Sequence, residues 1–148
     1  MQSFCGDAAW TIARDGAGKP HFLEQGAPHF SLSHAGGLAV AAVCEASAVG
    51  VDLEVARDAA KEAAVAARYF TPSEQTIFAE HGDFRALWTR KEARAKCLGT
   101  PLSSVLSRDL ALPTRTYRVG NLTLSLAAEE DFEVDFWNDI PDIQEVIL

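Results

Sequence analysis

The 148-residue chain has only three cysteines, Cys5, Cys44 and Cys97, and they lie far apart. An odd number of widely spaced cysteines predicts neither a disulfide framework nor a zinc site. Cys44 and Cys97 have apolar neighbours in the sequence, so we expect both to be inert thiols of the core. The first ten residues contain neither the basic nor the apolar segment of a secretory leader, and we therefore expect a cytoplasmic protein.

Long hydrophobic runs are also lacking. No apolar run approaches the roughly 18 residues that a membrane span requires, so we expect no membrane partner. Repeats, low-complexity segments and linkers are absent from the sequence as well. With 48% hydrophobic and 23% charged residues, the chain has the composition of one folded domain.

The last 20 residues contain no lysine or arginine, although they hold eight of the 21 acidic residues. The net charge of −8 therefore comes from this end of the chain, and the remaining 13 acidic residues are balanced by 13 basic ones. Because an acidic end repels phosphate backbones, we expect no nucleic acid partner. The basic residues gather between Arg85 and Lys96, which indicates either a solvated basic face or a binding region for phosphate or an acidic partner.

The segment from Asp83 to Gly99 predicts one amphipathic helix. Asp83 is a favourable N-cap, Gly99 is a favourable C-terminal stop, and strong helix formers lie between them. At about 100° per residue, five apolar side chains fall on one stripe that should face the core. These are Phe84, Leu87, Trp88, Ala95 and Leu98.

Lys91 lies in the middle of this apolar stripe, with Glu92 on its flank and Lys96 one turn beyond Glu92. A cation among apolar side chains costs several kcal/mol unless it finds a counter-charge or extends to solvent, so Lys91 is expected to point at a ligand. The alternative is that Lys91 lies over Trp88 while Glu92 pairs with Lys96. Such a helical pair is worth only about 0.2–0.5 kcal/mol.

Residues 49–55 (VGVDLEV) show the alternation typical of a strand with one buried face. Asp52 and Glu54 share the polar face with Gly50. Their Cα atoms should lie about 6.6 Å apart, so the two carboxylates can converge on one cation. The alternative is a solvent-facing acidic edge of a half-buried strand.

The remaining pattern alternates strands and helices without a boundary between domains. We expect strands at residues 8–14, 29–33, 38–44, 116–119, 122–126 and 132–137, and helices at 59–68 and 71–81. The turn at 34–37 should join two strands into a hairpin and place His34 at a strand end. This order predicts an α+β fold, with an antiparallel sheet packed by two or three helices.

Three carboxylates therefore stand out: Asp52, Glu54 and Glu92. A few carboxylates with room for water are what Mg²⁺ takes when it also binds substrate phosphates. Three basic side chains would add positive charge around such a metal: Lys91, Lys96 and His34. Since the chain has no glycine-rich phosphate loop, the metal and these side chains would have to hold the phosphates.

Four short motifs occur in a fixed order: residues 18–20 (GKP), 30–34 (FSLSH), 50–54 (GVDLE) and 88–96 (WTRKEARAK). In this order and spacing the chain resembles the 4′-phosphopantetheinyl transferase superfamily, and the motif order is that of the two-lobed, Sfp-type members. The resemblance implies a single 4′-phosphopantetheinyl transferase-like domain over residues 1–148. Residues 1–48 would be a remnant of the first lobe and residues 49–148 the second lobe.

The resemblance implies an enzyme that transfers the 4′-phosphopantetheine arm of coenzyme A to a serine of an apo acyl or peptidyl carrier protein, with Mg²⁺ as cofactor. By motif position, Asp52, Glu54 and Glu92 would hold the metal. The coenzyme A contacts would be Lys19, Ser33, His34, Lys91 and Lys96. Glu92 and Lys96 would be catalytic, with Glu92 taking the serine proton.

Two other function classes fit the same residues. One is a non-catalytic or degenerate relative that binds coenzyme A or a carrier protein without transfer. The other is an unrelated Mg²⁺-dependent phosphate-ester hydrolase. In addition, a shortened first lobe would expose apolar surface, which favours self-association into a homo-oligomer.

Overall fold

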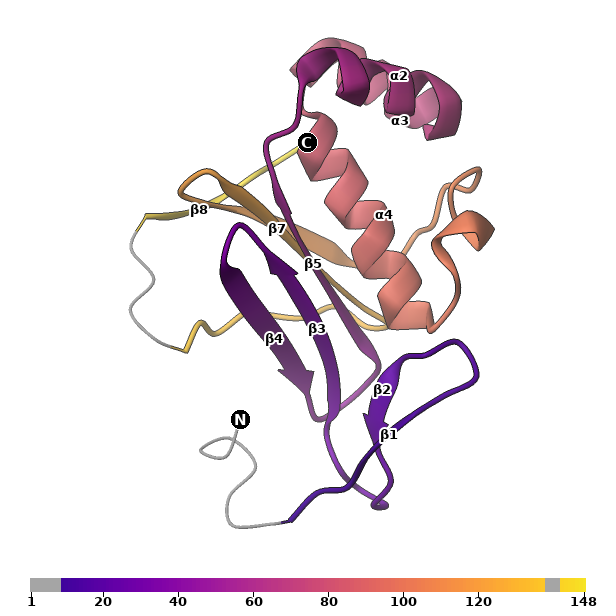
Figure 1. Cartoon of the computed structure of the whole chain (residues 1–148), viewed down its shortest axis with the longest axis vertical. Helices are drawn as coiled ribbons and strands as arrows, with labels where there is room; N and C mark the ends of the chain where they lie inside the picture. The colour runs from indigo at the N-terminus through magenta and orange to yellow at the C-terminus, as the bar shows by residue number, and fades with distance from the viewer. Residues whose placement is uncertain (1–8, 138–141) are drawn as a thin grey trace.

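The computed structural model describes residues 9–137 and 142–148. Within them the predicted α+β fold is confirmed, with antiparallel strands and three α-helices (Figure 1). The strands are β1 (Ile12–Arg14), β2 (Pro20–Phe22), β3 (His29–Ala35), β4 (Leu38–Cys44), β5 (Val49–Val55), β6 (Thr114–Val119), β7 (Leu122–Ala128) and β8 (Ile143–Glu145). The helices are α2 (Ala59–Tyr69), α3 (Pro72–His81) and α4 (Phe84–Leu98), and a single 3₁₀ turn covers Leu102–Ser104. Cys5 and the first residue of the predicted strand at 8–14 lie outside the described residues.

The strands form two small hairpins and one larger sheet. β1 pairs with β2 and β3 pairs with β4, both antiparallel, and the second pair confirms the predicted hairpin. The larger sheet has the order β5-β7-β6-β8, again with antiparallel pairs. α4 runs across this sheet against β5, β7 and β6, while α2 and α3 lie together near the N-terminal end of α4 (Figure 1).

Capping residues fix the start of α3 and both ends of α4. In α3, the Thr71 side chain accepts a hydrogen bond from the Glu74 N–H, and the Glu74 carboxylate accepts one from the Thr71 N–H. In α4, Asp83 accepts a hydrogen bond from Ala86 N–H, and the helix ends at Gly99 in the left-handed conformation. These local signals fix the length of α4, and with it the positions of the side chains along it.

α4 is buried on two faces, whereas the sequence predicts one. Phe84 and Trp88 pack among aromatic side chains of the helical layer, as expected for the apolar stripe. Leu98 is 41% exposed, so its predicted place in that stripe is wrong. The second buried face lies on the sheet and carries the small side chains of Ala93 and Cys97, which allow a close approach of helix and sheet.

The expected strand at residues 132–137 is also wrong. This segment is not part of a strand, and Arg115 binds its backbone by donating from Nε to the Phe132 carbonyl oxygen at 2.8 Å. The edge of β6 is instead occupied by β8, with Tyr117 opposite Glu145. Alternation alone indicates an extended chain and does not say which segment reaches an open sheet edge.

Across the described parts of the chain, no helix has the length and apolar character that crossing a membrane would require.

Candidate active site

The contact between α4 and β5 builds the site, and Gly50 makes that contact possible. A Cβ atom at Gly50 would lie 1.9 Å from the backbone oxygen of Ala93 and 2.4 Å from the backbone nitrogen of Cys97. Only glycine permits helix and strand backbones to come this close. As a result, the polar face of β5 lies directly against α4.

On the side of β5 away from β7, two serines of β3 bind the β5 backbone. Ser31 Oγ accepts a hydrogen bond from the Val51 N–H at 3.1 Å, and Ser33 Oγ accepts one from the Leu53 N–H at 3.1 Å. Ser33 Oγ also donates to Asp52 Oδ1 at 3.2 Å. The two serines of the FSLSH motif therefore replace a neighbouring strand along this edge of β5.

Asp52 is enclosed by these contacts and is only 5% exposed, so the alternative of a solvent-facing acidic edge is wrong at this position. Lys96 Nζ donates to Asp52 Oδ1 at 2.8 Å and to the Val51 carbonyl oxygen at 3.0 Å. Asp52 Oδ2 is buried and has no hydrogen-bond partner among the described residues. Burial raises the pKa of Asp52, and the ammonium of Lys96 opposes this rise.

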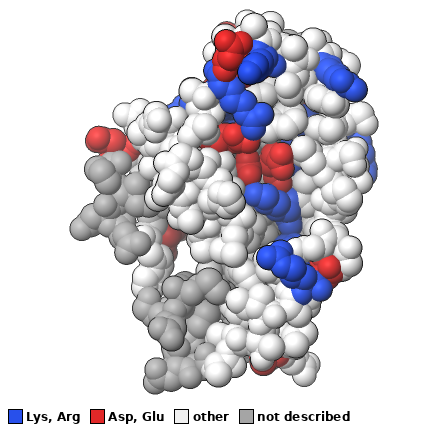
Figure 2. Space-filling view, in the orientation of Figure 1, with Lys and Arg blue, Asp and Glu red and all other residues white. Residues whose placement is uncertain are grey.

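Glu92 and Glu54 complete an acidic cluster with Asp52. Burial raises the pKa of Glu92 to about 7, and the negative charges of Asp52 and Glu54 contribute to that rise. Glu54 itself accepts a hydrogen bond from Arg57 at 2.7 Å. Figure 2 shows one face of the molecule, with acidic atoms grouped near its middle and basic atoms above and below them. The structure thus brings the three predicted carboxylates into one neighbourhood.

The acidic cluster has the carboxylate donors of a divalent cation site, but its oxygen atoms do not surround one common position. In residues 9–137 and 142–148, no group of three or more His, Cys, Asp or Glu side chains is arranged so that it could hold a metal ion. Lys96 and Arg57 instead neutralise Asp52 and Glu54. The unpartnered oxygen of Asp52 and the raised pKa of Glu92 nevertheless indicate negative charge that a hard cation would offset. The donor chemistry of these residues therefore fits Mg²⁺, whereas the arrangement of the described side chains does not enclose one.

The pKa of Glu92 leads to a prediction about folding stability. Its carboxyl has an ordinary pKa of 4.5 when unfolded and about 7 when folded, so ionisation destabilises the fold as pH rises through that interval. In metal-free buffer, Glu92→Gln should be more stable than the wild type at about pH 8. We expect roughly 1 kcal/mol, a discounted value because the side chain is partly exposed and screened.

The check is urea unfolding at about pH 8 and about pH 4, where the advantage of Glu92→Gln should disappear. Glu45→Gln, an exposed position, serves as the control and should match the wild type at both pH values. An advantage of equal size at both pH values would contradict the assigned cause.

The predicted basic residues, unlike the three carboxylates, do not all lie at the acidic cluster. Lys19 Nζ donates to the Cys97 carbonyl oxygen at 3.0 Å and to the Val49 carbonyl oxygen at 3.3 Å, so it lies where α4 ends and β5 begins. His34 is exposed. Because neighbouring residues of a strand point to opposite faces, its side chain lies on the face of β3 opposite to Ser33. Lys96 is the predicted cation that directly contacts the acidic cluster.

Lys91 is not brought to the acidic cluster. It is 2% exposed, and its Nζ lies 2.8 Å from Glu74 Oε2 of α3. The same nitrogen donates to the Leu106 carbonyl oxygen at 2.9 Å. Its counter-charge is therefore the capping-box glutamate of the preceding helix, which the sequence analysis did not connect with it.

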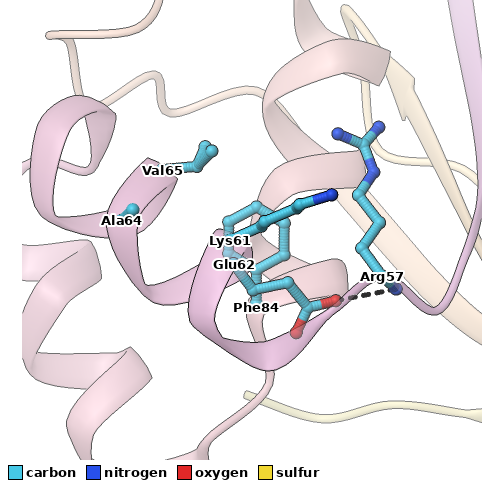
Figure 3. Close-up of a pocket in the computed structure, with 6 residues that line it drawn as sticks. All are labelled: Arg57, Lys61, Glu62, Ala64, Val65 and Phe84. Atoms are coloured by element: carbon cyan, nitrogen blue, oxygen red, sulfur yellow. Dashed lines mark hydrogen bonds between the residues drawn. The ribbon is translucent and has the colours of Figure 1, made fainter.

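Arg57 is a site residue that the sequence analysis missed. It follows Glu54 by three residues, and that spacing next to the GVDLE motif is the signal that was available. Arg57 also lines a pocket of about 350 Å³ between α2 and the start of α4, together with Lys61, Val65 and Phe84 (Figure 3). It therefore connects this largely apolar pocket to the acidic cluster.

The fold and the site together define an α+β domain with a carboxylate cluster between a strand and a long helix. The model of the 4′-phosphopantetheinyl transferase superfamily matches residues 48–141, and the chain belongs to this superfamily. This confirms the resemblance to the superfamily, while the two-lobed motif order and the division at residue 48 stay predictions.

Relatives agree with this assignment. The chain is 34% identical over 122 residues to 4′-phosphopantetheinyl transferase psf-1 of Bacillus pumilus, which covers 78% of this chain and 50% of that protein. It is 33% identical over 105 residues to 4′-phosphopantetheinyl transferase HetI of Nostoc sp.. This aligned segment covers 64% of this chain and 44% of that protein. The chain spans about half the length of the curated relatives it matches.

Proposed function

We propose that this chain is a 4′-phosphopantetheinyl transferase, which moves the 4′-phosphopantetheine arm of coenzyme A to a serine of an apo acyl or peptidyl carrier protein. The observation that carries the proposal is the acidic cluster in contact with Lys96, which lies within the residues 48–141 that the superfamily model matches. The named relatives are transferases of this kind, which supports the same activity here.

In this reaction the serine Oγ forms a bond to the phosphorus that carries the pantetheine arm, and the bond to the leaving adenosine 3′,5′-bisphosphate breaks. Glu92 would accept the serine proton at its carboxylate. Lys96, one helical turn further on, would place its ammonium beside the phosphates.

Asp52, Glu54 and Glu92 would hold Mg²⁺. When bound, the metal would neutralise charge that builds on the leaving group. Lys96 and Arg57, which pair with Asp52 and Glu54 here, would then be free to turn toward phosphate oxygens. Lys19, Ser33 and His34 remain proposed coenzyme A contacts, whereas the burial of Lys91 leads us to leave it out of that set.

The test is intact-mass analysis of an apo carrier protein after incubation with this protein, coenzyme A and Mg²⁺, beside an EDTA control. A gain of one phosphopantetheine group, about 340 Da, that disappears with EDTA would support the proposal. No gain with several carrier proteins, but measurable coenzyme A binding, would support a non-catalytic relative instead. Release of adenosine 3′,5′-bisphosphate without a carrier protein would support a hydrolase.

Asp52→Asn should lower the rate of transfer at least about 100-fold, since it removes the most buried charge of the cluster at almost unchanged volume. The rate of mass gain at saturating coenzyme A measures the effect, and Glu45→Gln is the control that should keep the wild-type rate. Because Lys96 is 32% exposed, it can turn to solvent in the variant, and the fold should persist. If the Asp52→Asn variant kept the wild-type rate, the proposed role of Asp52 in metal binding would be wrong.

A further inference from the structure

A second pocket, on the side of α4 away from the acidic cluster, contains two arginines. Arg90 and Arg94 each lie two residues from Glu92, which is about 200° around a helix. The pocket has a volume of about 420 Å³ and is formed by α3, α4 and the segment after the 3₁₀ turn. Its charged lining residues are Glu74, Arg90, Arg94 and Asp109, and we call it the arginine pocket.

Neither arginine forms a direct ion pair with a described residue. Within the described residues, Arg90 donates from Nη2 to the Thr114 carbonyl oxygen at 3.4 Å, and Arg94 donates from Nε to Thr114 Oγ1 at 2.9 Å. Each guanidinium has five N–H donors, so most of them have no acceptor among the described residues and are open to solvent or to a ligand. Burial lowers the pKa of both groups. At Arg94 the charge of Arg90 adds to this effect, whereas the charges of Glu74 and Asp109 oppose it.

The two carboxylates of the pocket are already engaged. Glu74 pairs with Lys91 at 2.8 Å and also accepts the capping-box hydrogen bond of α3. Asp109 accepts hydrogen bonds from two hydroxyl groups at the start of α3. The formal charges of the lining residues balance, but the two carboxylates bind Lys91, a backbone N–H and hydroxyl groups instead of the guanidinium N–H groups. An anion between the arginines would accept hydrogen bonds from those guanidinium N–H groups.

Apart from Ser73, the rest of the lining is apolar: Ile77, Leu87, Leu110 and Leu148. We propose that the arginine pocket binds a small organic anion, with a phosphate or carboxylate head between Arg90 and Arg94 and a short apolar body against these side chains. A planar guanidinium matches both kinds of head with paired N–H donors. This site is separate from the acidic cluster, so it does not depend on the proposed transfer reaction.

The experiment is calorimetric titration of the full chain with three probes at low ionic strength: butyl phosphate, butyrate and inorganic phosphate. We expect one of the two butyl-chain probes to bind one site, and the tighter of the two identifies the preferred head. Inorganic phosphate should bind at least tenfold more weakly than butyl phosphate because it lacks the apolar body. Arg90→Gln and Arg94→Gln should each weaken binding at least tenfold.

Arg68→Gln is the matched control, since it removes one arginine from the exposed face of α2 and should leave the affinity unchanged. Urea unfolding verifies that each variant is folded, and Arg94→Lys, which keeps the charge but not the fork of donors, replaces any glutamine variant that is not. No binding by the wild type, or equal binding by the arginine variants, would overturn the proposal. So would displacement of the probe by saturating coenzyme A, because the pocket would then belong to the coenzyme A site.

Discussion

Gly50→Ala is expected to destabilise the protein by about 3 kcal/mol or more, a large share of the roughly 5–15 kcal/mol that a domain of this kind has. The added Cβ would lie 1.9 Å from the Ala93 backbone oxygen and 2.4 Å from the Cys97 backbone nitrogen, and both are backbone atoms of α4. A flexible side chain can turn away from such a contact, but a helix backbone can move only as a body. α4 would have to lift from β5, and its packing on the sheet would be lost with it.

The measurement is the urea midpoint of Gly50→Ala, with Gly16→Ala as the matched control. A Cβ at Gly16 would meet nothing within 4 Å, and its backbone is not in the left-handed region. Gly16→Ala should therefore be neutral or more stable by up to about 1 kcal/mol. A Gly50→Ala variant that fails to fold while Gly16→Ala folds agrees with the prediction. A loss below about 1 kcal/mol would show that helix and strand do not need to lie this close.

Local signals in the sequence explain most of the fold that was predicted correctly. The caps at Asp83 and Gly99 define α4 to within its observed bounds, and the capping box at Thr71 defines the start of α3. The alternation of residues 49–55 gives β5, and the turn at Gly120 and Asn121 gives the β6-β7 hairpin. Each of these signals lies within a few residues of the structure that it specifies.

What the sequence did not reveal depends on contacts between distant residues. The predicted strand at 132–137 does not form and β8, which was not predicted, pairs with β6, because a local pattern does not specify which segment reaches a sheet edge. In the site, the carboxylates could be chosen from their spacing and from the family motifs. The support from Ser31 and Ser33 could not, because their hydrogen bonds reach 20 residues along the chain to β5.

Lys91 is the residue for which local reasoning and structure differ most. A cation in an apolar stripe indicates either a ligand or a counter-charge, and the structure supplies the counter-charge from α3. Whether a buried ion pair stabilises a protein overall depends on its environment, but removing one partner alone leaves an uncompensated charge. This asymmetry separates a structural role for Lys91 from a role in binding coenzyme A.

Lys91→Met is expected to lose about 3–5 kcal/mol of folding stability, because it keeps the apolar stem but leaves the Glu74 carboxylate buried without a cation. Glu74→Gln should also destabilise, since it leaves the ammonium without its partner while the glutamine oxygen can still cap α3. The double variant has neither charge and should recover much of the loss. Urea unfolding of the four proteins gives the coupling free energy of the pair directly.

The control is Lys61→Met on the exposed side of α2, where a change within about 0.5 kcal/mol is expected. If Lys91 instead binds coenzyme A phosphates, Lys91→Met would keep the wild-type urea midpoint and lose affinity for coenzyme A in a direct titration. The two roles thus predict opposite results in the same pair of measurements. Because Lys91 also donates to the backbone of Leu106, the structural role predicts that the loop after the 3₁₀ turn loses protection from hydrogen exchange in the variant.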